Sequence, residues 1–172
     1  MLEALIFVVF PFCMLFAAIS DMLSMTIANR VPLLLVGTFL AVAPLTGMDW
    51  TTLGLHLAAG ALVLVVTFGL FAIGGMGGGD AKLMAATAVW MGLSISLAQY
   101  LVASAFFGGM LTLAILAFRS SALAVYTSRN MFLRHFANQA GGIPYGIALG
   151  IGGLMTYPDT QLMQWALARL TS

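Results

Sequence analysis

Charged side chains are scarce in this sequence. Only 6% of its 172 residues are Asp, Glu, Lys or Arg, whereas 62% are hydrophobic; a soluble domain carries about a quarter charged residues. The mean hydropathy of +1.10 therefore indicates an integral membrane protein. Six basic residues against five acidic ones leave a net charge of +1, which excludes the basic surface that nucleic-acid binding requires.

Cysteine is almost absent as well. The single Cys13 excludes an intrachain disulfide and a CxxC metal site, and we expect no metal and no cofactor. Basic residues are missing before Arg30, and Glu3 lies near the start of the chain. A secretory signal peptide needs a basic N-terminal region, so residues 4–20 are interpreted as a retained first span.

Charges and turn-forming residues divide the chain into apolar segments of the length that crosses a bilayer, roughly 17 to 25 residues. We expect an all-α polytopic membrane protein, one domain over residues 1–172, with six spans near residues 4–20, 31–47, 53–73, 81–96, 98–118 and 141–157. The turn between the fourth and fifth spans falls between Gly92 and Gln99, because a merged helix of about 38 residues would be roughly twice the bilayer thickness. The amphipathic C-terminal segment TQLMQWALARLTS is expected to lie along the interface.

The basic residues predict the orientation. With the N-terminus outside, the inner loops are 21–30, 74–82 and 119–140, and they hold five of the six basic residues: Arg30, Lys82, Arg119, Arg129 and Arg134. This distribution follows the positive-inside rule. Two acids, Asp21 and Asp80, then lie on the inner side, whereas Glu3, Asp49 and Asp159 lie outside.

Asp21 and Asp80 thus sit at the same depth of the membrane, at the end of the first span and the start of the fourth. Two carboxyl groups brought close together cannot both ionise, so one keeps a proton while the other acts as a base on a water molecule. Such a pair is the minimum equipment of a hydrolase.

Each of these residues also has a plain structural interpretation. Asp80 directly precedes the fourth span, where an Asp caps a helix, and Asp21 could end a span in headgroup water. Lys82 could be a topological anchor, and Asn29 could cap the second span instead of binding substrate. The glycine run GGMGGG at 74–79 favours function, because a connecting loop needs less conformational freedom than a segment that lets another backbone approach or moves to admit it.

Three motifs resemble the type IV prepilin peptidases, a branch of the intramembrane GxGD aspartic proteases. GGGDAKL at 77–83 matches the GxGD signature, and Asp21, Ile27 and Asn29 resemble the first aspartate motif, with Ala28 in place of its usual proline. GGIPYGIALGIGG at 141–153 resembles the last-span motif of the small CpaA/TadV branch, which serves Flp/Tad pili.

The resemblance implies a six-helix GxGD protease in the bacterial inner membrane, with Asp21 and Asp80 as catalytic residues facing the cytoplasm. Its substrates would be prepilins, whose short basic leader it removes. Gly77, Gly79, Lys82 and Asn29 are the candidate loop or substrate-binding residues. The CxxC insert of the longer, methylating relatives has no counterpart here, so we expect cleavage without N-methylation.

Two alternatives remain open. A non-catalytic pilus-assembly subunit or small transporter would use the acids to bind a coupling ion, although no acid falls at mid-membrane and no inverted repeat is visible. A presenilin-like protease would share the aspartate pair but cut within a substrate's membrane span. The oligomeric state is left undetermined by the sequence.

Overall fold

The computed structural model describes residues 2–121 and 142–170, and these residues are helical with no strand among them. The elements are α1 (Leu2–Ser24), α2 (Arg30–Val42), the 3-10 turn η1 (Pro44–Thr46), α3 (Trp50–Ala72), α4 (Gly78–Met91), α5 (Ile95–Ser120), α8 (Gly146–Thr156), the 3-10 turn η2 (Tyr157–Asp159) and α9 (Gln161–Leu170). The expected all-α polytopic architecture is confirmed. Arg129 and Arg134, counted above among the inner-loop basic residues, lie outside the described residues.

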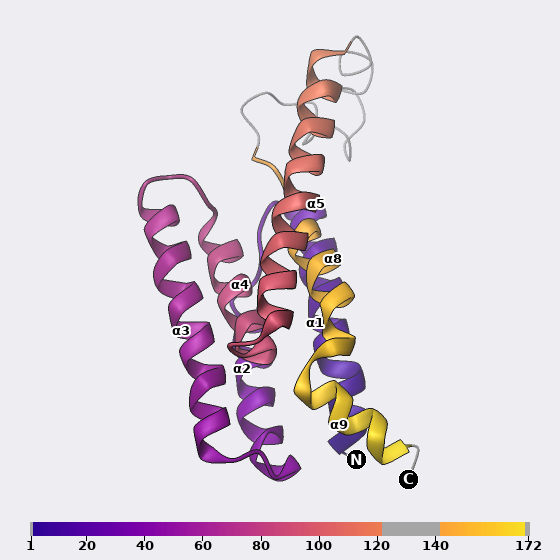
Figure 1. Ribbon diagram of the computed structural model, residues 1–172. Helices are drawn as coiled ribbons and strands as arrows, with labels where there is room; N and C mark the ends of the chain where they lie inside the picture. Colours follow the sequence, from indigo (N-terminus) through magenta and orange to yellow (C-terminus); the bar gives the residue numbers. More distant parts are fainter. Residues whose placement is uncertain (1, 122–141, 171–172) are drawn as a thin grey trace.

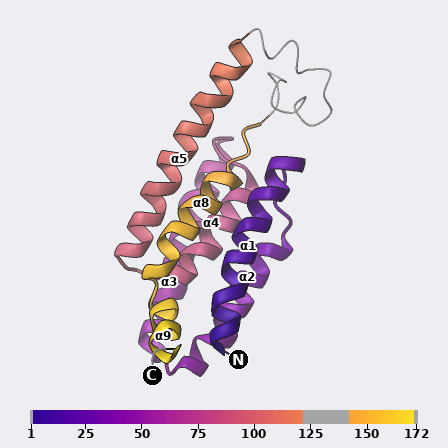
Figure 2. The same cartoon turned by 90° about the vertical axis from the view of Figure 1, so that its right-hand side faces the viewer.

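The long helices run up and down, and most of the connections lie near the two ends of the bundle, whereas the α4–α5 turn lies between them (Figure 1). The α1–α2 and α3–α4 connections lie at one end, together with the end of α5. The N-terminus, the α2–α3 connection and α9 lie at the other end. Figure 2 shows the same division, with α1, α2 and α8 side by side. The segments that carry Asp21 and Asp80 are therefore at the same end, as the sequence predicted.

Three helices, α1, α3 and α5, have 23, 23 and 26 residues and are apolar enough to cross a membrane. The other three helices at the predicted positions, α2, α4 and α8, are shorter, with 13, 14 and 11 residues, and α2 continues through η1 as an apolar helical segment from Arg30 to Thr46. At 1.5 Å per residue, 14 residues extend about 21 Å, which is less than the hydrocarbon core of roughly 30 Å. Each short helix is held by packing against longer helices: α2 and α8 contact α1, and α4 contacts α3 and α5.

Helix α4 lies at the centre of this packing and contacts α2, α3, α5 and α8. Every residue from Leu83 to Met91 is buried, which explains why the helix shows no polar face. Trp90 is fully buried among the rings of Phe10, Phe39 and Tyr157. Its Nε1–H donates to the Leu35 carbonyl at 2.9 Å, so α4 is also tied to α2 by a buried hydrogen bond.

A tight turn at 92–94 separates α4 from α5, within the interval predicted for it. Gly92 adopts a φ of +65°, and a side chain there would meet the His56 ring at 2.8 Å. His56 is buried, stacks on Phe39 and pairs its Nδ1 with the Val89 carbonyl at 2.7 Å. His56 is thus a packing residue between α2, α3 and α4.

The outer faces of the bundle are strongly apolar. Large side chains such as Val8, Val65 and Leu113 are 61%, 73% and 69% exposed on α1, α3 and α5. A soluble monomer rarely exposes contiguous apolar surface of this kind, whereas acyl chains cover it in a membrane. Helix α9, predicted as an amphipathic tail segment, packs on α1 through Leu162 and Ala166.

Candidate active site

Asp21 lies in the last full turn of α1 and is only 5% exposed. Met25 ends the helix in the left-handed conformation, with a φ of 53°, and its N–H donates to the Asp21 carbonyl at 2.8 Å. The carboxylate of Asp21 is held from a distant part of the chain, because its Oδ2 accepts a hydrogen bond from the Gly146 N–H at 2.7 Å. Hydrogen bonds to an ionised acceptor are among the stronger ones in proteins, so α8 fixes the orientation of this side chain.

Asp80 lies inside the first turn of α4, and the expectation that it directly precedes this helix is wrong. The helix begins at Gly78 with Gly77 as its N-cap, which makes Asp80 the third helical residue. From this position an acidic side chain reaches back to the N-cap N–H, and Asp80 does hydrogen bond to the Gly77 backbone. That contact and the helix dipole stabilise a helix start built from glycines, which are poor helix formers by themselves.

The second carboxylate oxygen of Asp80, Oδ1, does not take part in this capping. Asp80 Oδ1 is buried and makes no hydrogen bond within the described residues. A capping role needs only the oxygen that faces Gly77. Because an unsatisfied buried carboxylate oxygen costs free energy, the second oxygen is a feature that capping leaves unexplained.

The two aspartates line one cavity of about 610 Å³ at the end of the bundle where α1 ends and α4 begins. Its wall includes the loop 74–77, two residues of α5 and the segment that enters α8. The lining residues are Asp21, Met25, Gly74, Gly75, Met76, Gly77, Asp80, Thr112, Arg119, Gly142, Ile143 and Tyr145. The predicted meeting of Asp21 and Asp80 on one side of the protein is thus seen directly as a shared cavity.

Ile27 explains why the segments that carry the acids come together. A side chain on Gly79 would lie 3.2 Å from the Ile27 Cβ, and a side chain on Gly146 would lie 3.0 Å from the Ile27 Cδ1. Ile27 itself is buried, so its side chain fills the space that the two glycines leave open. The three sequence motifs, which span residues 21 to 153, meet around this one residue.

Gly77 also lies where there is no room for a side chain. A Cβ at this position would lie 2.6 Å from Asp80 Oδ2, closer than side-chain atoms approach without a shift. Gly77 and Gly79 therefore have defined contacts with the site, one with the carboxylate and one with Ile27.

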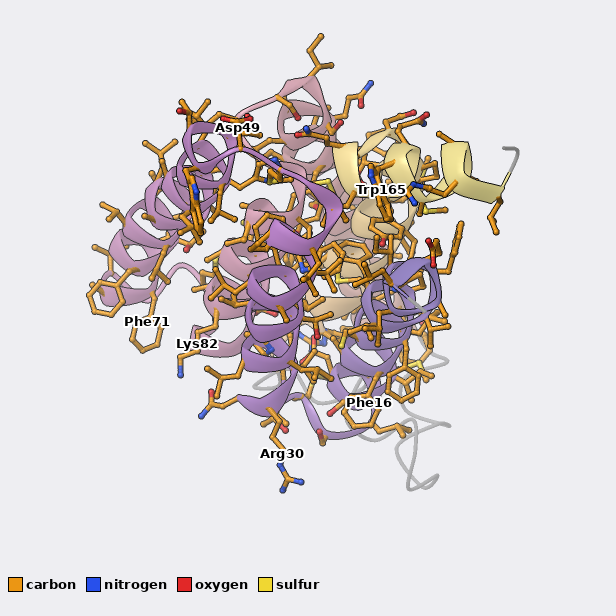
Figure 3. All side chains as sticks on the ribbon, turned by 90° about the horizontal axis from the view of Figure 1, so that it is seen from below. Phe16, Arg30, Asp49, Phe71, Lys82 and Trp165 are labelled. Carbon is orange, nitrogen blue, oxygen red and sulfur yellow. The ribbon has the colours of Figure 1, made fainter. Side chains whose placement is uncertain are left out.

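Lys82 and Asn29 face away from this cavity. The Lys82 Nζ donates to Asn29 Oδ1 at 3.0 Å, and the pair lines a different, apolar groove between α2, α3 and α4. Figure 3 shows the Lys82 side chain pointing outward from the bundle. The structure thus brings the two aspartates and the glycines together but places the other two candidates elsewhere.

Sequence reasoning gave no site role to four residues at or beside the cavity. Tyr145 was only part of the last-span motif, and its hydroxyl donates to the Ser104 carbonyl at 3.1 Å. Arg119, whose Nη2 donates to the Gly142 carbonyl at 3.0 Å, was counted only as a topological charge. Gly146 and Thr112 complete the set. The motif at 141–153 was the available signal for Tyr145 and Gly146, whereas nothing in the sequence singles out Thr112.

The sequence was also compared with models of known protein families. A family model described as the type IV leader peptidase family matches residues 8–126, which include both aspartates and the glycine run. The chain belongs to the type IV leader peptidase family. No curated protein and no solved structure matched the chain. As a leader peptidase of the prepilin-processing type it is a membrane-embedded protease, and membership favours this activity over the transport alternative.

Proposed function

We propose that this leader peptidase is an aspartic endopeptidase in which Asp21 and Asp80 form the catalytic pair. The observation that carries the proposal is the cavity that both carboxylates line, with Asp80 Oδ1 buried and without a hydrogen-bond partner among the described residues. Two carboxyl groups that line one cavity disfavour a second negative charge, so in the proposed mechanism the pair shares a proton, with one carboxylate acting as a base and the other carboxyl as an acid.

The proposed reaction proceeds without a covalent intermediate. The ionised carboxylate takes a proton from a water molecule as its oxygen attacks the scissile carbonyl carbon. The protonated carboxyl then gives its proton to the leaving amine, so that the pair ends with one proton as it began. Each aspartate receives one backbone N–H, Asp21 from Gly146 and Asp80 from Gly77, so we treat the two as a coupled pair and assign neither role to one residue.

The proposed substrates are prepilins of the Flp/Tad type, cut at the cytoplasmic face of the inner membrane. Arg30, Lys82 and Arg119 lie at or near the end of the bundle that holds the cavity, as the positive-inside rule expects of a cytoplasmic side. The cavity wall formed by Gly74, Gly75 and Gly77 leaves backbone accessible to an extended peptide. We further propose that the product is released without N-methylation.

The test is leader removal by Asp21→Asn and Asp80→Asn variants in membranes that contain a Flp-type prepilin. An amide keeps the volume of the carboxyl group but cannot exchange the proton, so each variant is expected to lose at least about 100-fold in rate. Asp49→Asn is the matched control, because Asp49 is an exposed acid at the opposite end of the bundle that caps α3 through Thr52. Normal cleavage by either of the first two variants would refute the aspartic mechanism.

Mass spectrometry of the cleaved N-terminus tests the finer statements. The expected product carries a free, unmethylated α-amino group, even when a methyl donor is present. A methylated product would refute that part of the proposal and leave the assignment of the aspartates intact.

A further inference from the structure

A second concave site lies outside the proteolytic cavity. It is a groove of about 410 Å³ between α2 and α3, with α4 as its floor. Small residues of α3 and α4, Gly60, Ala85 and Ala86, form part of this groove, and Gly60 permits the close approach of α3 to α4, because a side chain there would collide with Val89. The groove exists because α2 and α3 both pack on α4 and leave a space between each other.

The walls of the groove are open to the surroundings of the bundle. Leu33 on α2 is 71% exposed and Leu64 on α3 is 44% exposed, and both line the groove. In a membrane these positions contact acyl chains, so the apolar part of the groove fits a hydrocarbon chain.

A cation closes one end of this apolar groove. Lys82 is exposed, and its Nζ donates to Asn29 Oδ1, a neutral amide oxygen. The hydrogen bond positions the ammonium group without neutralising its charge. Arg30, which follows Asn29 and begins α2, adds a second exposed cation, and Figure 3 shows both basic side chains pointing outward. A positive end joined to an apolar groove complements one ligand class with both properties, an anionic amphiphile.

We propose that this groove binds an anionic phospholipid, with an acyl chain along the groove and the phosphate at the Lys82 ammonium group. The site is separate from the cavity that contains Asp21 and Asp80, so it is a lipid site on the protease and does not depend on the catalytic assignment. Clusters of basic residues at helix ends that face the membrane surface recognise anionic headgroups in this way.

The test is native mass spectrometry of the delipidated full chain, titrated with phosphatidylglycerol or with phosphatidylcholine of identical acyl chains. We expect phosphatidylglycerol to bind at least about fivefold more tightly, the factor that one cation near an anionic surface supplies. Lys82→Gln is expected to reduce this preference, since Arg30 is then the one cation left at that end of the groove, and Lys82→Arg is expected to keep it. Arg169→Gln is the control for the loss of a basic residue, since Arg169 lies over the Trp165 ring in α9, at the other end of the bundle.

A second pair of variants tests the groove itself. Leu64→Trp fills the groove and is expected to weaken binding of both lipids, whereas Val65→Trp, at a more exposed neighbouring position outside the groove, is expected to leave both affinities unchanged. Equal affinity of the unaltered protein for the two lipids, or a preference that is undiminished in Lys82→Gln, overturns the proposal. Displacement of phosphatidylglycerol by millimolar inorganic phosphate also overturns it, because the site would then bind a free anion and not a lipid.

Discussion

Replacing Gly146 by alanine tests how far the last helix controls the chemistry of the first. The added Cβ would lie 2.9 Å from both the Cβ and the Oδ2 of Asp21 and 3.0 Å from the Ile27 Cδ1. Since real Cβ atoms avoid contacts this short, Asp21 or the start of α8 must shift. Either shift lengthens the 2.7 Å hydrogen bond from the Gly146 N–H to Asp21.

The size of the effect follows from that hydrogen bond. A hydrogen bond to a charged group contributes about 1.5–3 kcal/mol. If the transition state of cleavage loses this contribution, the rate falls by about 10- to 150-fold, because each 1.36 kcal/mol corresponds to a factor of ten. Global stability should change much less, because alanine is a better helix former than glycine and offsets part of the strain.

The assay is the initial rate of leader removal by the purified protein with a saturating prepilin concentration, normalised to the folded fraction from thermal unfolding. Gly37→Ala on α2 is the matched control, because nothing lies within 4 Å of the position that its Cβ would occupy. It is expected to retain full activity and equal or higher stability. A Gly146→Ala protein as active as Gly37→Ala would show that the hydrogen bond to Asp21 has no part in catalysis.

Three further predictions follow from the contacts described above. Gly77→Val should lower the rate per folded molecule by at least tenfold, because its Cβ would lie 2.6 Å from Asp80 Oδ2; unchanged rates with lower stability would instead indicate that Asp80 only caps α4. In a protein with Cys13 replaced by serine, a cysteine at Ile73, which is 80% exposed, should react with a membrane-impermeant thiol reagent only from the cytoplasmic side. A cysteine at Leu45, 67% exposed at the other end, should react only from outside, and the reverse pattern would contradict the proposed orientation. Trp90→Phe should lower the free energy of unfolding by about 1–3 kcal/mol in chemical denaturation, because it removes a buried hydrogen bond between α4 and α2 and leaves a cavity where the larger ring was; a change below about 0.5 kcal/mol would refute that reasoning.

The sequence predicted the features that depend on local composition. Apolar segments bounded by charges located the helices, and the break near Gly92 followed from the length that a bilayer allows. The placement of Asp21 and Asp80 at one end followed from counting charges in alternating loops. These predictions succeeded because hydropathy and chain alternation are properties of consecutive residues.

Features that depend on tertiary contacts were missed. The glycine run was expected to lie outside the helix, yet α4 begins at Gly78. The Asp80 carboxylate caps this helix start, and Ile27 packs against Gly79 in the space that a side chain on Gly79 would fill. Helix α8 is shorter than the span expected at 141–157, because its start is set by the contacts of Gly146 with Asp21 and Ile27, which hydropathy does not report. Lys82 is two residues from Asp80 in the sequence. Successive residues of a helix point about 100° apart, so the two side chains leave α4 on nearly opposite faces, and Lys82 lies beside the apolar groove.

The contact of Ile27 with Gly79 and Gly146 has a consequence for biosynthesis. The first aspartate enters the membrane with the first helix and the second with α4, but the backbone N–H that orients Asp21 belongs to residue 146 of a chain of 172. While α8 is still unmade, Ile27 lacks one of the two glycines against which it packs, and Asp21 lacks its donor. Between the synthesis of Asp80 and that of Gly146 the nascent protein therefore carries both acids without the donor that orients Asp21, and in the proposed mechanism it cannot cleave a substrate until α8 docks.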